Sequence, residues 1–235
     1  MSIPKIIHYC WFGGGPISPE SRKCIESWKK YCPDYKIMAW NEQNFDISQN
    51  RYAQQAYAAK KYAFVSDYAR LVVLYEYGGI YLDTDVELVR PLDELLEYKG
   101  FIGMEHSAPS PYGRTLLVNT GSGVGAEPGC GMIGKMLAAY RNAAFIQETG
   151  EPDLRTCTQR DTPLFTKAGL QQKNEQQELD GFLVLPTDCF SPFDYVTERM
   201  HRTPRTFGIH YYQGSWQSGD KANRWRKRFK CTKVG

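Results

Sequence analysis

The chain has 235 residues, 42% hydrophobic and 23% charged, which fits one large or two small globular domains. Seven cysteines without a CxxC pair exclude a zinc ribbon and a disulfide scaffold and favour thiols in a reducing cytosol. The first residues lack the pattern of a signal peptide, and no apolar window is long enough to span a bilayer, so we expect a cytoplasmic protein.

The charge is distributed unevenly along the chain. Residues 199–235 contain ten Lys or Arg and one acid, whereas the rest of the chain contains 19 basic and 25 acidic residues. A basic end on an acidic body predicts contact with an anionic surface.

The first half of the sequence predicts the opening of a parallel sheet. Residues 3–12 read as a buried strand, Ser18-Pro19-Glu20 opens a helix that runs to about Tyr31, and residues 35–40 form a second strand. Apolar positions then recur with a helical period from 53 to 77, as one buried stripe of Phe64, Tyr68, Leu71, Val72 and Tyr75. Gly78-Gly79 ends this helix by admitting positive φ, and a short apolar strand follows.

The second half is less regular. We expect a short helix at 91–96, strands at 101–104 and 116–125, a helix at 129–141, helices around 160–177, strands at 182–185 and 207–211, and a basic helix at 219–231. No repeat or clean linker divides the chain. We therefore predict one α/β domain over residues 1–218, followed by a basic helix or tail over 219–235.

Two aspartates follow the short apolar strand, in Gly79-Ile80-Tyr81-Leu82-Asp83-Thr84-Asp85. No Lys or Arg lies within four residues, so this is a concentration of uncompensated negative charge. A hard divalent cation explains it best, and a cation held by two carboxylates keeps positions open for water and phosphate oxygens. The alternative is a turn in which the carboxylates cap backbone amides. The spacing does not match an EF-hand loop, because Leu88 stands where that loop needs glycine.

Other candidate residues lie before and after the acids. Ser66, Asp67 and Arg70 belong to the preceding helix and are expected to line the same cleft, although Asp67 and Arg70 could form only a surface ion pair. Trp11 ends the first strand, where open parallel sheets bind ligands, and is either a stacking platform or core. His210, Ser215 and Trp216 are grouped on a glycine-bearing segment. Weaker polar segments are 119–121, 159–161 and Asp188.

These motifs resemble those of glycosyltransferase family 32. Residues 3–14, Ala63-Phe64-Val65-Ser66-Asp67-Tyr68-Ala69-Arg70 and 77–85 look like the DXD-containing sugar transferases of capsular and surface polysaccharide synthesis, and distantly like the sugar-transferring domains of large bacterial toxins. The likeness is strong over 3–95 and thin between 142 and 205. It implies a single-domain GT-A fold, a UDP-sugar donor, Mn²⁺ or Mg²⁺ as cofactor, and retention of anomeric configuration.

The resemblance also implies roles for individual residues. Trp11 would stack on the uracil, Asp67 and Arg70 would hold sugar hydroxyls, and Asp85 would bind the metal directly. Asp83 would reach the ribose or sugar and a metal-bound water. Either His210, Ser215 or Trp216 would complete the metal and diphosphate site. The remaining expected donor-site residues are Ser66, Tyr81 and Thr84.

We therefore expect a metal-dependent retaining transferase that moves a hexose or N-acetylhexosamine from a UDP-sugar to a glycan, and we expect this acceptor to be a lipid-linked intermediate. The basic segment 219–231 is expected to dock peripherally on an anionic membrane; its alternative is a solvated tail. Nucleic-acid binding is not expected, because the aromatic residues of the tail are not interleaved along a basic face. The alternative functions are a non-catalytic nucleotide-sugar-binding protein and a nucleotide-sugar hydrolase.

Overall fold

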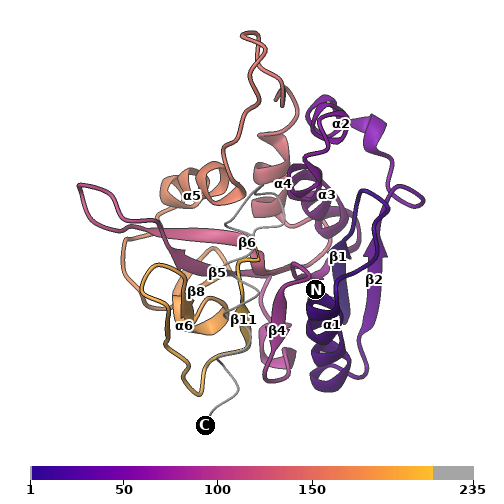
Figure 1. The fold of residues 1–235 in the computed structure, drawn as a ribbon. Helices are drawn as coiled ribbons and strands as arrows, with labels where there is room; N and C mark the ends of the chain where they lie inside the picture. Colours follow the sequence, from indigo (N-terminus) through magenta and orange to yellow (C-terminus); the bar gives the residue numbers. More distant parts are fainter. Residues whose placement is uncertain (1, 214–235) are drawn as a thin grey trace.

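The computed structural model describes residues 2–213, which form an α/β fold around one mixed seven-stranded sheet (Figure 1). In spatial order its strands are β2 (Lys36–Trp40), β1 (Ile6–Cys10), β3 (Gly79–Tyr81), β6 (Leu116–Ala126), β5 (Gly100–His106), β8 (Phe182–Leu185) and β7 (Gln177–Leu179). Strands β2, β1 and β3 are parallel, whereas β6 runs antiparallel to both β3 and β5. The predicted α/β class and the parallel opening are confirmed.

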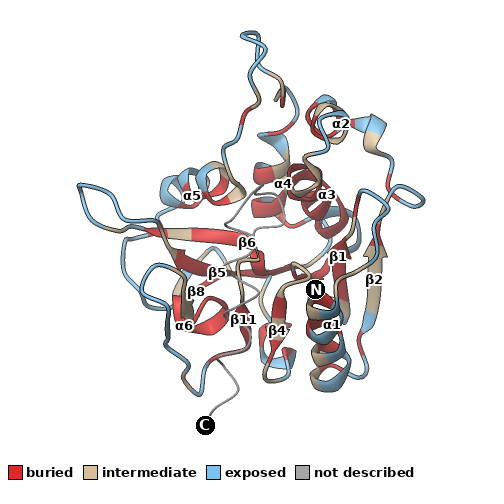
Figure 2. Ribbon diagram, viewed as in Figure 1, coloured by how far each residue is buried: buried red, intermediate tan, exposed pale blue. Residues whose placement is uncertain are grey.

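Helices cover both faces of the sheet. One layer contains α2 (Arg51–Ala58), α3 (Tyr62–Tyr77), α4 (Gly131–Ala138) and α5 (Cys157–Lys167), and the other contains α1 (Pro19–Tyr31) and α6 (Thr187–Phe190) (Figure 1). The second layer also holds a separate two-stranded sheet of β4 (Val86–Leu88) and β11 (Gly208–His210). Two buried apolar clusters lie between these layers and the sheet. The central strands are therefore mostly buried, whereas the edge strand β2 is largely of intermediate burial (Figure 2).

The predicted helix over 53–77 is two helices. The chain breaks between α2 and α3, where Lys60 adopts a left-handed conformation with φ of 58°. The helical periodicity continues across this break because both helices pack on the same cluster, and so it concealed the turn. Helix α3 is buried from Phe64 to Leu74, and Tyr75, which we expected in the buried stripe, is 40% exposed.

The second half departs further from expectation. The segment 160–177 contains only the end of α5 and the start of β7, and the short helix at 91–96 is a 3₁₀ turn over Asp93–Leu95. Strand β4 was not predicted. The expected strand at 207–211 exists as β11, but it pairs with β4 outside the main sheet. The remaining elements are a 3₁₀ turn at Ile47–Gln49 and a hairpin of β9 (Phe193–Asp194) and β10 (Arg199–Met200).

A buried histidine fixes where β3 begins. His8 of β1 accepts a hydrogen bond at Nδ1 from the Trp40 indole at 3.0 Å, and its Nε2 donates to the Gly78 carbonyl at 2.8 Å. Burial lowers the pKa of His8 to about 4, so the ring is neutral and the tautomer is set by these two partners. Gly79 follows with φ of 97°, and a Cβ there would lie 2.8 Å from the Ile6 carbonyl oxygen. The α3–β3 junction is thereby held against β1.

Candidate functional site

The two aspartates of the DXD motif lie at the carboxyl end of β3, where the chain leaves the sheet. The Asp83 amide donates to the Gly121 carbonyl at 2.9 Å, and the Val86 amide donates to the Asp83 carbonyl at 3.0 Å, which closes a tight turn. Because β1 and β3 are parallel, this is also the edge where Trp11 leaves β1. The predicted placement of the acids at a sheet edge is confirmed.

Asp83 is paired with a buried arginine. The Arg70 guanidinium on α3 is 3% exposed and contacts Asp83 at 3.1 Å, Asp67 at 3.2 Å and the Thr120 hydroxyl at 3.1 Å. The Tyr81 hydroxyl donates to the same Asp83 oxygen at 3.0 Å. Our expectation of an uncompensated Asp83 was therefore wrong: the balancing cation is thirteen residues upstream, one helix away, and a search within four residues could not find it.

Asp85 is held by β11 and the segment after it. Its Oδ1 lies 3.4 Å from Nε2 of His210, and its Oδ2 accepts a hydrogen bond from the Gln213 amide at 2.7 Å. The reason is the β4–β11 ladder, which pairs His210 with Val86, the residue next to Asp85. Burial alone raises the pKa of Asp85, but His210 and the Gln213 amide together bring it below its ordinary value. The structure thus places His210 beside the acids, and its role as a metal ligand stays a prediction.

These three residues fit a divalent cation. Asp83, Asp85 and His210 each offer one ligand atom, and the three atoms lie within 4.8 Å of one another. Two carboxylates and an imidazole suit Mn²⁺ or Mg²⁺ and leave coordination positions for phosphate oxygens. Moreover, Nδ1 of His210 is buried without a hydrogen-bond partner, so the ring is not fully committed within the described residues.

The surroundings carry more acids than bases. Asp67, Glu105 and Asp161 are 8%, 8% and 1% exposed. Asp67 lies close to Asp83 and Arg70, Asp161 lies close to Asp67 and Arg70, and Glu105 lies close to His210. Burial raises the pKa of Asp67 to about 6 and that of Asp161 to about 8. Arg160 also faces them, but its guanidinium is 2.7 Å from Asp153. A bound cation would relieve this accumulation of buried carboxyl groups.

A second layer supports the motif from β5 and β6. The Asn119 side chain donates to Glu105 at 2.6 Å and accepts from the Gly121 amide at 2.7 Å. A Cβ at Gly121 would collide with Oδ2 of Asp83, so only glycine leaves room for that carboxylate. The sequence showed 119–121 as a weak polar segment only, because its role depends on the pairing of β3 with β6.

Asp161 is the residue that the sequence analysis undervalued most. It lies on α5, and both of its carboxylate oxygens are buried without a hydrogen-bond partner. Its nearest charged neighbours include Asp67 and Arg70, which are expected donor-site residues. An acid in the first turns of a helix is common, and only the structure shows that this one points inward.

The polar groups of the other predicted donor-site residues have partners other than the two acids. Trp11 is half-buried, and its indole donates to the Gly15 carbonyl at 2.7 Å. The Ser66 hydroxyl donates within its own helix to the Tyr62 carbonyl at 3.1 Å, and that of Thr84 lies 3.5 Å from Ser21 of α1. Ser215 and Trp216 lie outside the described residues. The donor-binding roles of these residues stay predictions.

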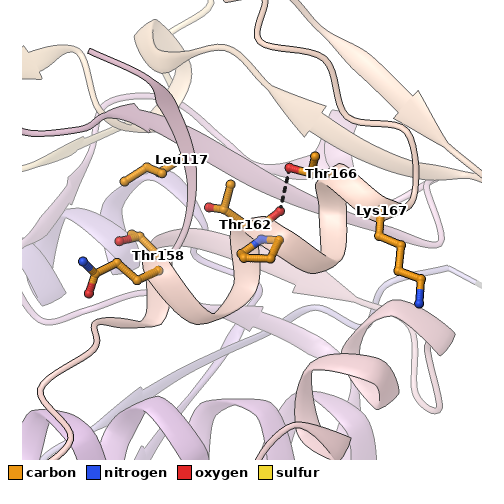
Figure 3. Close-up of a pocket in the computed structure, with 7 residues that line it drawn as sticks. Leu117, Thr158, Thr162, Thr166 and Lys167 are labelled. Carbon is orange, nitrogen blue, oxygen red and sulfur yellow. Dashed lines mark hydrogen bonds between the residues drawn. The ribbon is translucent and has the colours of Figure 1, made fainter. Parts of the chain in front are cut away.

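Two of the hollows in the described part of the molecule differ in their lining. One of about 570 Å³ runs along α5 and is lined by threonines, Leu117, Gln159, Pro163 and Lys167 (Figure 3). It holds no carboxylate or imidazole, so it is not the centre of the chemistry. The other, of about 280 Å³, is polar and includes Tyr212, whose ring centroid is 4.1 Å from that of His210.

Part of the chain resembles proteins of a known family. Residues 18–102 match the family described as "Glycosyltransferase sugar-binding region containing DXD motif". Inositol phosphoceramide mannosyltransferase 3 of Schizosaccharomyces pombe is 33% identical over 127 residues, which cover 49% of this chain and 33% of that protein. Mannosyl phosphorylinositol ceramide synthase SUR1 of Saccharomyces cerevisiae is 30% identical over 111 residues, 43% of this chain and 27% of its own. The chain thus spans about a third of the length of these relatives.

Solved glycosyltransferase structures show a weaker likeness. The PaToxG glycosyltransferase superposes with a TM-score of 0.49 at 24% identity and covers 72% of each chain. The galactosyltransferase LgtC, solved with donor and acceptor sugar analogs, gives a TM-score of 0.45 at 14% identity and covers 98% of this chain and 97% of its own.

The buried carboxyl of Asp161 predicts a pH-dependent stability. Its folded-state pKa of about 8 lies above the ordinary value of 3.8. The neutral carboxyl therefore contributes fully to the free energy of unfolding below pH 4, and this contribution is lost as the pH rises towards 8. Asp161→Asn does not titrate. In urea unfolding, the free energy of unfolding of the variant should therefore rise relative to that of the wild type as the pH increases, by on the order of a few kcal/mol at pH 8.

The control is Asp180→Asn, because the Asp180 side chain is fully exposed. This variant should track the wild type at every pH. A stability difference between Asp161→Asn and the wild type that stays constant from pH 5 to pH 8 would contradict the assignment.

Proposed function

We propose that this chain, whose residues 18–102 match the glycosyltransferase sugar-binding region containing a DXD motif, is a metal-dependent retaining hexosyltransferase. It moves a hexose or N-acetylhexosamine from a UDP-sugar to a glycan acceptor, for example a lipid-linked intermediate. The observation that carries the proposal is the convergence of Asp83, Asp85 and His210 within 4.8 Å at the carboxyl edge of the sheet.

Asp83, Asp85 and His210 would hold Mn²⁺ or Mg²⁺. When bound, the ion supplies charge neutralisation of the donor diphosphate and Lewis-acid assistance to its departure. Asp85 and His210, which the β4–β11 ladder brings together, would be two of the ligands, and Asp83 would contribute the oxygen next to Gly121. Arg70 keeps Asp83 oriented through the other carboxylate oxygen, at 3.1 Å.

The α3 residues would hold the sugar. Arg70 has a buried Nε–H without a partner, and Asp67 accepts from the same guanidinium. A donor-sugar oxygen would satisfy that N–H, which otherwise costs free energy as an unpaired buried donor. Trp11, at the same edge of the sheet, would stack on the base.

Retention of configuration is proposed to proceed by same-face attack. The acceptor oxygen bonds to C1 as the bond from C1 to the diphosphate oxygen breaks, and the hydroxyl proton passes to the departing phosphate oxygen. Asp83 and Asp85 are the proposed cation ligands, and Asp67 is paired with Arg70. These roles argue against any of the three as a carboxylate nucleophile. A covalent glycosyl adduct in the intact-mass spectrum would overturn this mechanism.

Mannose is a second candidate for the transferred sugar, because relatives of this chain are named mannosyltransferases. Their matched segments cover a third of their length, and the donor-specific contacts depend on loops outside the motif. Base recognition would then favour GDP over UDP. The two donors are distinguished directly by the assay below.

Donor turnover tests the proposal. UDP-Gal, UDP-Glc, UDP-GalNAc, UDP-GlcNAc and GDP-mannose are screened for release of nucleoside diphosphate with Mn²⁺ and with EDTA. We expect one donor to be used with Mn²⁺ only. Asp85→Asn, which removes a ligand, should lower turnover by at least about 100-fold.

Asp180→Asn is the matched control, because it makes the same change at a fully exposed side chain, and it should retain full turnover. No release from any donor by the wild type would favour the non-catalytic binding protein, whereas unchanged turnover in Asp85→Asn would contradict the role of Asp85 as a cation ligand. Release that no glycan acceptor accelerates would favour the hydrolase.

A peripheral position on the inner face of the cytoplasmic membrane is also proposed, through the basic segment 219–231, which lies outside the described residues. Its support is the sequence alone, as each Lys or Arg near an anionic surface contributes on the order of 1 kcal/mol. Within residues 2–213, no helix has both the length and the apolar character needed to cross a membrane. Sedimentation with anionic vesicles should retain the full chain and lose one that ends at Ser218; equal binding would contradict the proposal.

A further inference from the structure

A polar cleft of about 280 Å³ adjoins the candidate cation site. Its walls come from the end of β5, the loop before β6, the segment that follows α6, and residues 201–205. Tyr212 belongs to both places, because it lines the cleft and its ring lies on the His210 imidazole with centroids 4.1 Å apart. A ligand in this cleft would therefore lie next to the centre at which the donor sugar reacts.

The turn that places Tyr212 is a strained one. Tyr212 adopts φ of 51°, in the left-handed region that non-glycine residues seldom occupy. The same turn delivers the Gln213 amide to Asp85 at 2.7 Å. The chain thus holds the Tyr212 ring and the Asp85 carboxylate in one rigid arrangement, and such strain persists where the surroundings fix the geometry.

The charges of the cleft are internally balanced. Arg114 donates to Asp194 at 2.6 Å, and Arg205 contacts Asp188 at 3.0 Å, with the Thr203 hydroxyl on the same carboxylate at 2.7 Å. Two guanidinium groups therefore meet two carboxylates, so neither arginine of the lining is left without a carboxylate partner to recognise a phosphate. Arrays of this kind present fixed donors and acceptors to a neutral, hydroxyl-rich ligand.

Two further features point to such a ligand. The Nη2 of Arg114 is buried without a hydrogen-bond partner, so a donor is unsatisfied at the wall of the cleft. Tyr195 and Tyr212 stand 5.0 Å apart and supply aromatic faces beside the polar groups. The volume is just below the range of about 300–1,000 Å³ for drug-sized ligands, so it suits one ring rather than a whole glycan.

We propose that this cleft binds the acceptor, as a neutral polyhydroxylated six-membered ring of the sugar or inositol class. The inference rests on the proposed function for its reaction, but the cleft itself can be tested by binding alone. Tyr195 packs on the apolar face of the ring, and Arg114 donates to a ring hydroxyl through Nη2. The reactive hydroxyl then faces the side of Tyr212 that borders the cation site.

Saturation-transfer NMR with methyl hexopyranosides of glucose, galactose and mannose, and with myo-inositol, tests the binding. The wild type should bind at least one ring probe, and Tyr195→Ala should weaken that binding by about tenfold, the loss of one aromatic contact. Arg114→Lys keeps a cation beside Asp194 but removes the second donor, and should weaken binding similarly. Tyr112→Ala is the matched control, because Tyr112 is 98% exposed and does not line the cleft.

Three results would overturn the proposal: no ring probe bound by the wild type, equal binding by wild type and Tyr195→Ala, or displacement of the probe by inorganic phosphate, which would indicate an anion site. Thermal melting confirms that each variant is folded. Donor turnover measured on the same samples distinguishes a failure of the cleft proposal from a failure of the proposed function. Probe binding without release of nucleoside diphosphate would support ring binding in the cleft and contradict the proposed function. Release without probe binding would contradict only the proposed role of the cleft.

Discussion

The structure depends on one buried guanidinium that faces more carboxylates than it can neutralise. Arg70 contacts Asp67 and Asp83 at 3.2 and 3.1 Å, and the buried Asp161 lies beside it, while the half-buried Asp85 and the buried Glu105 lie next to His210. Water does not reach most of these groups, so the excess charge must be met by protons, which the raised pKa values of Asp67 and Asp161 express, or by a cation. A site of this kind is costly to fold and is explained by what it binds.

The fold is arranged to bring these groups together from distant parts of the chain. Helix α3 carries Arg70, the end of β3 carries the two aspartates, β6 supplies Gly121, and β11 supplies His210. His8, neutral and hydrogen-bonded on both ring nitrogens, sets the start of β3 against β1. The β4–β11 ladder then closes the site and passes directly into Tyr212 and the polar cleft. The cation site and the cleft are therefore parts of one structural unit.

Local patterns allowed the N-terminal half to be predicted well. The cap at Ser18, Pro19 and the glycine pair 78–79 act through the nearest residues, and all three end or begin helices as expected. The acids, Arg70 and His210 could also be selected, because their chemistry stands out at the ends of apolar runs. What failed was non-local: the Arg70–Asp83 pair, the role of Gly121 and the inward direction of Asp161 depend on strand pairing and helix rotation, which no short window of sequence contains. The helix break at Lys60 has no glycine or proline that would have predicted it.

The central claim is that Asp83, Asp85 and His210 hold a divalent cation. The most direct measurement is anomalous X-ray diffraction at the manganese edge from crystals grown with Mn²⁺. The account predicts one strong anomalous peak within coordination distance of both carboxylates and the imidazole. No peak there, in crystals whose acids are ordered and where Mn²⁺ is found elsewhere or not at all, would contradict it.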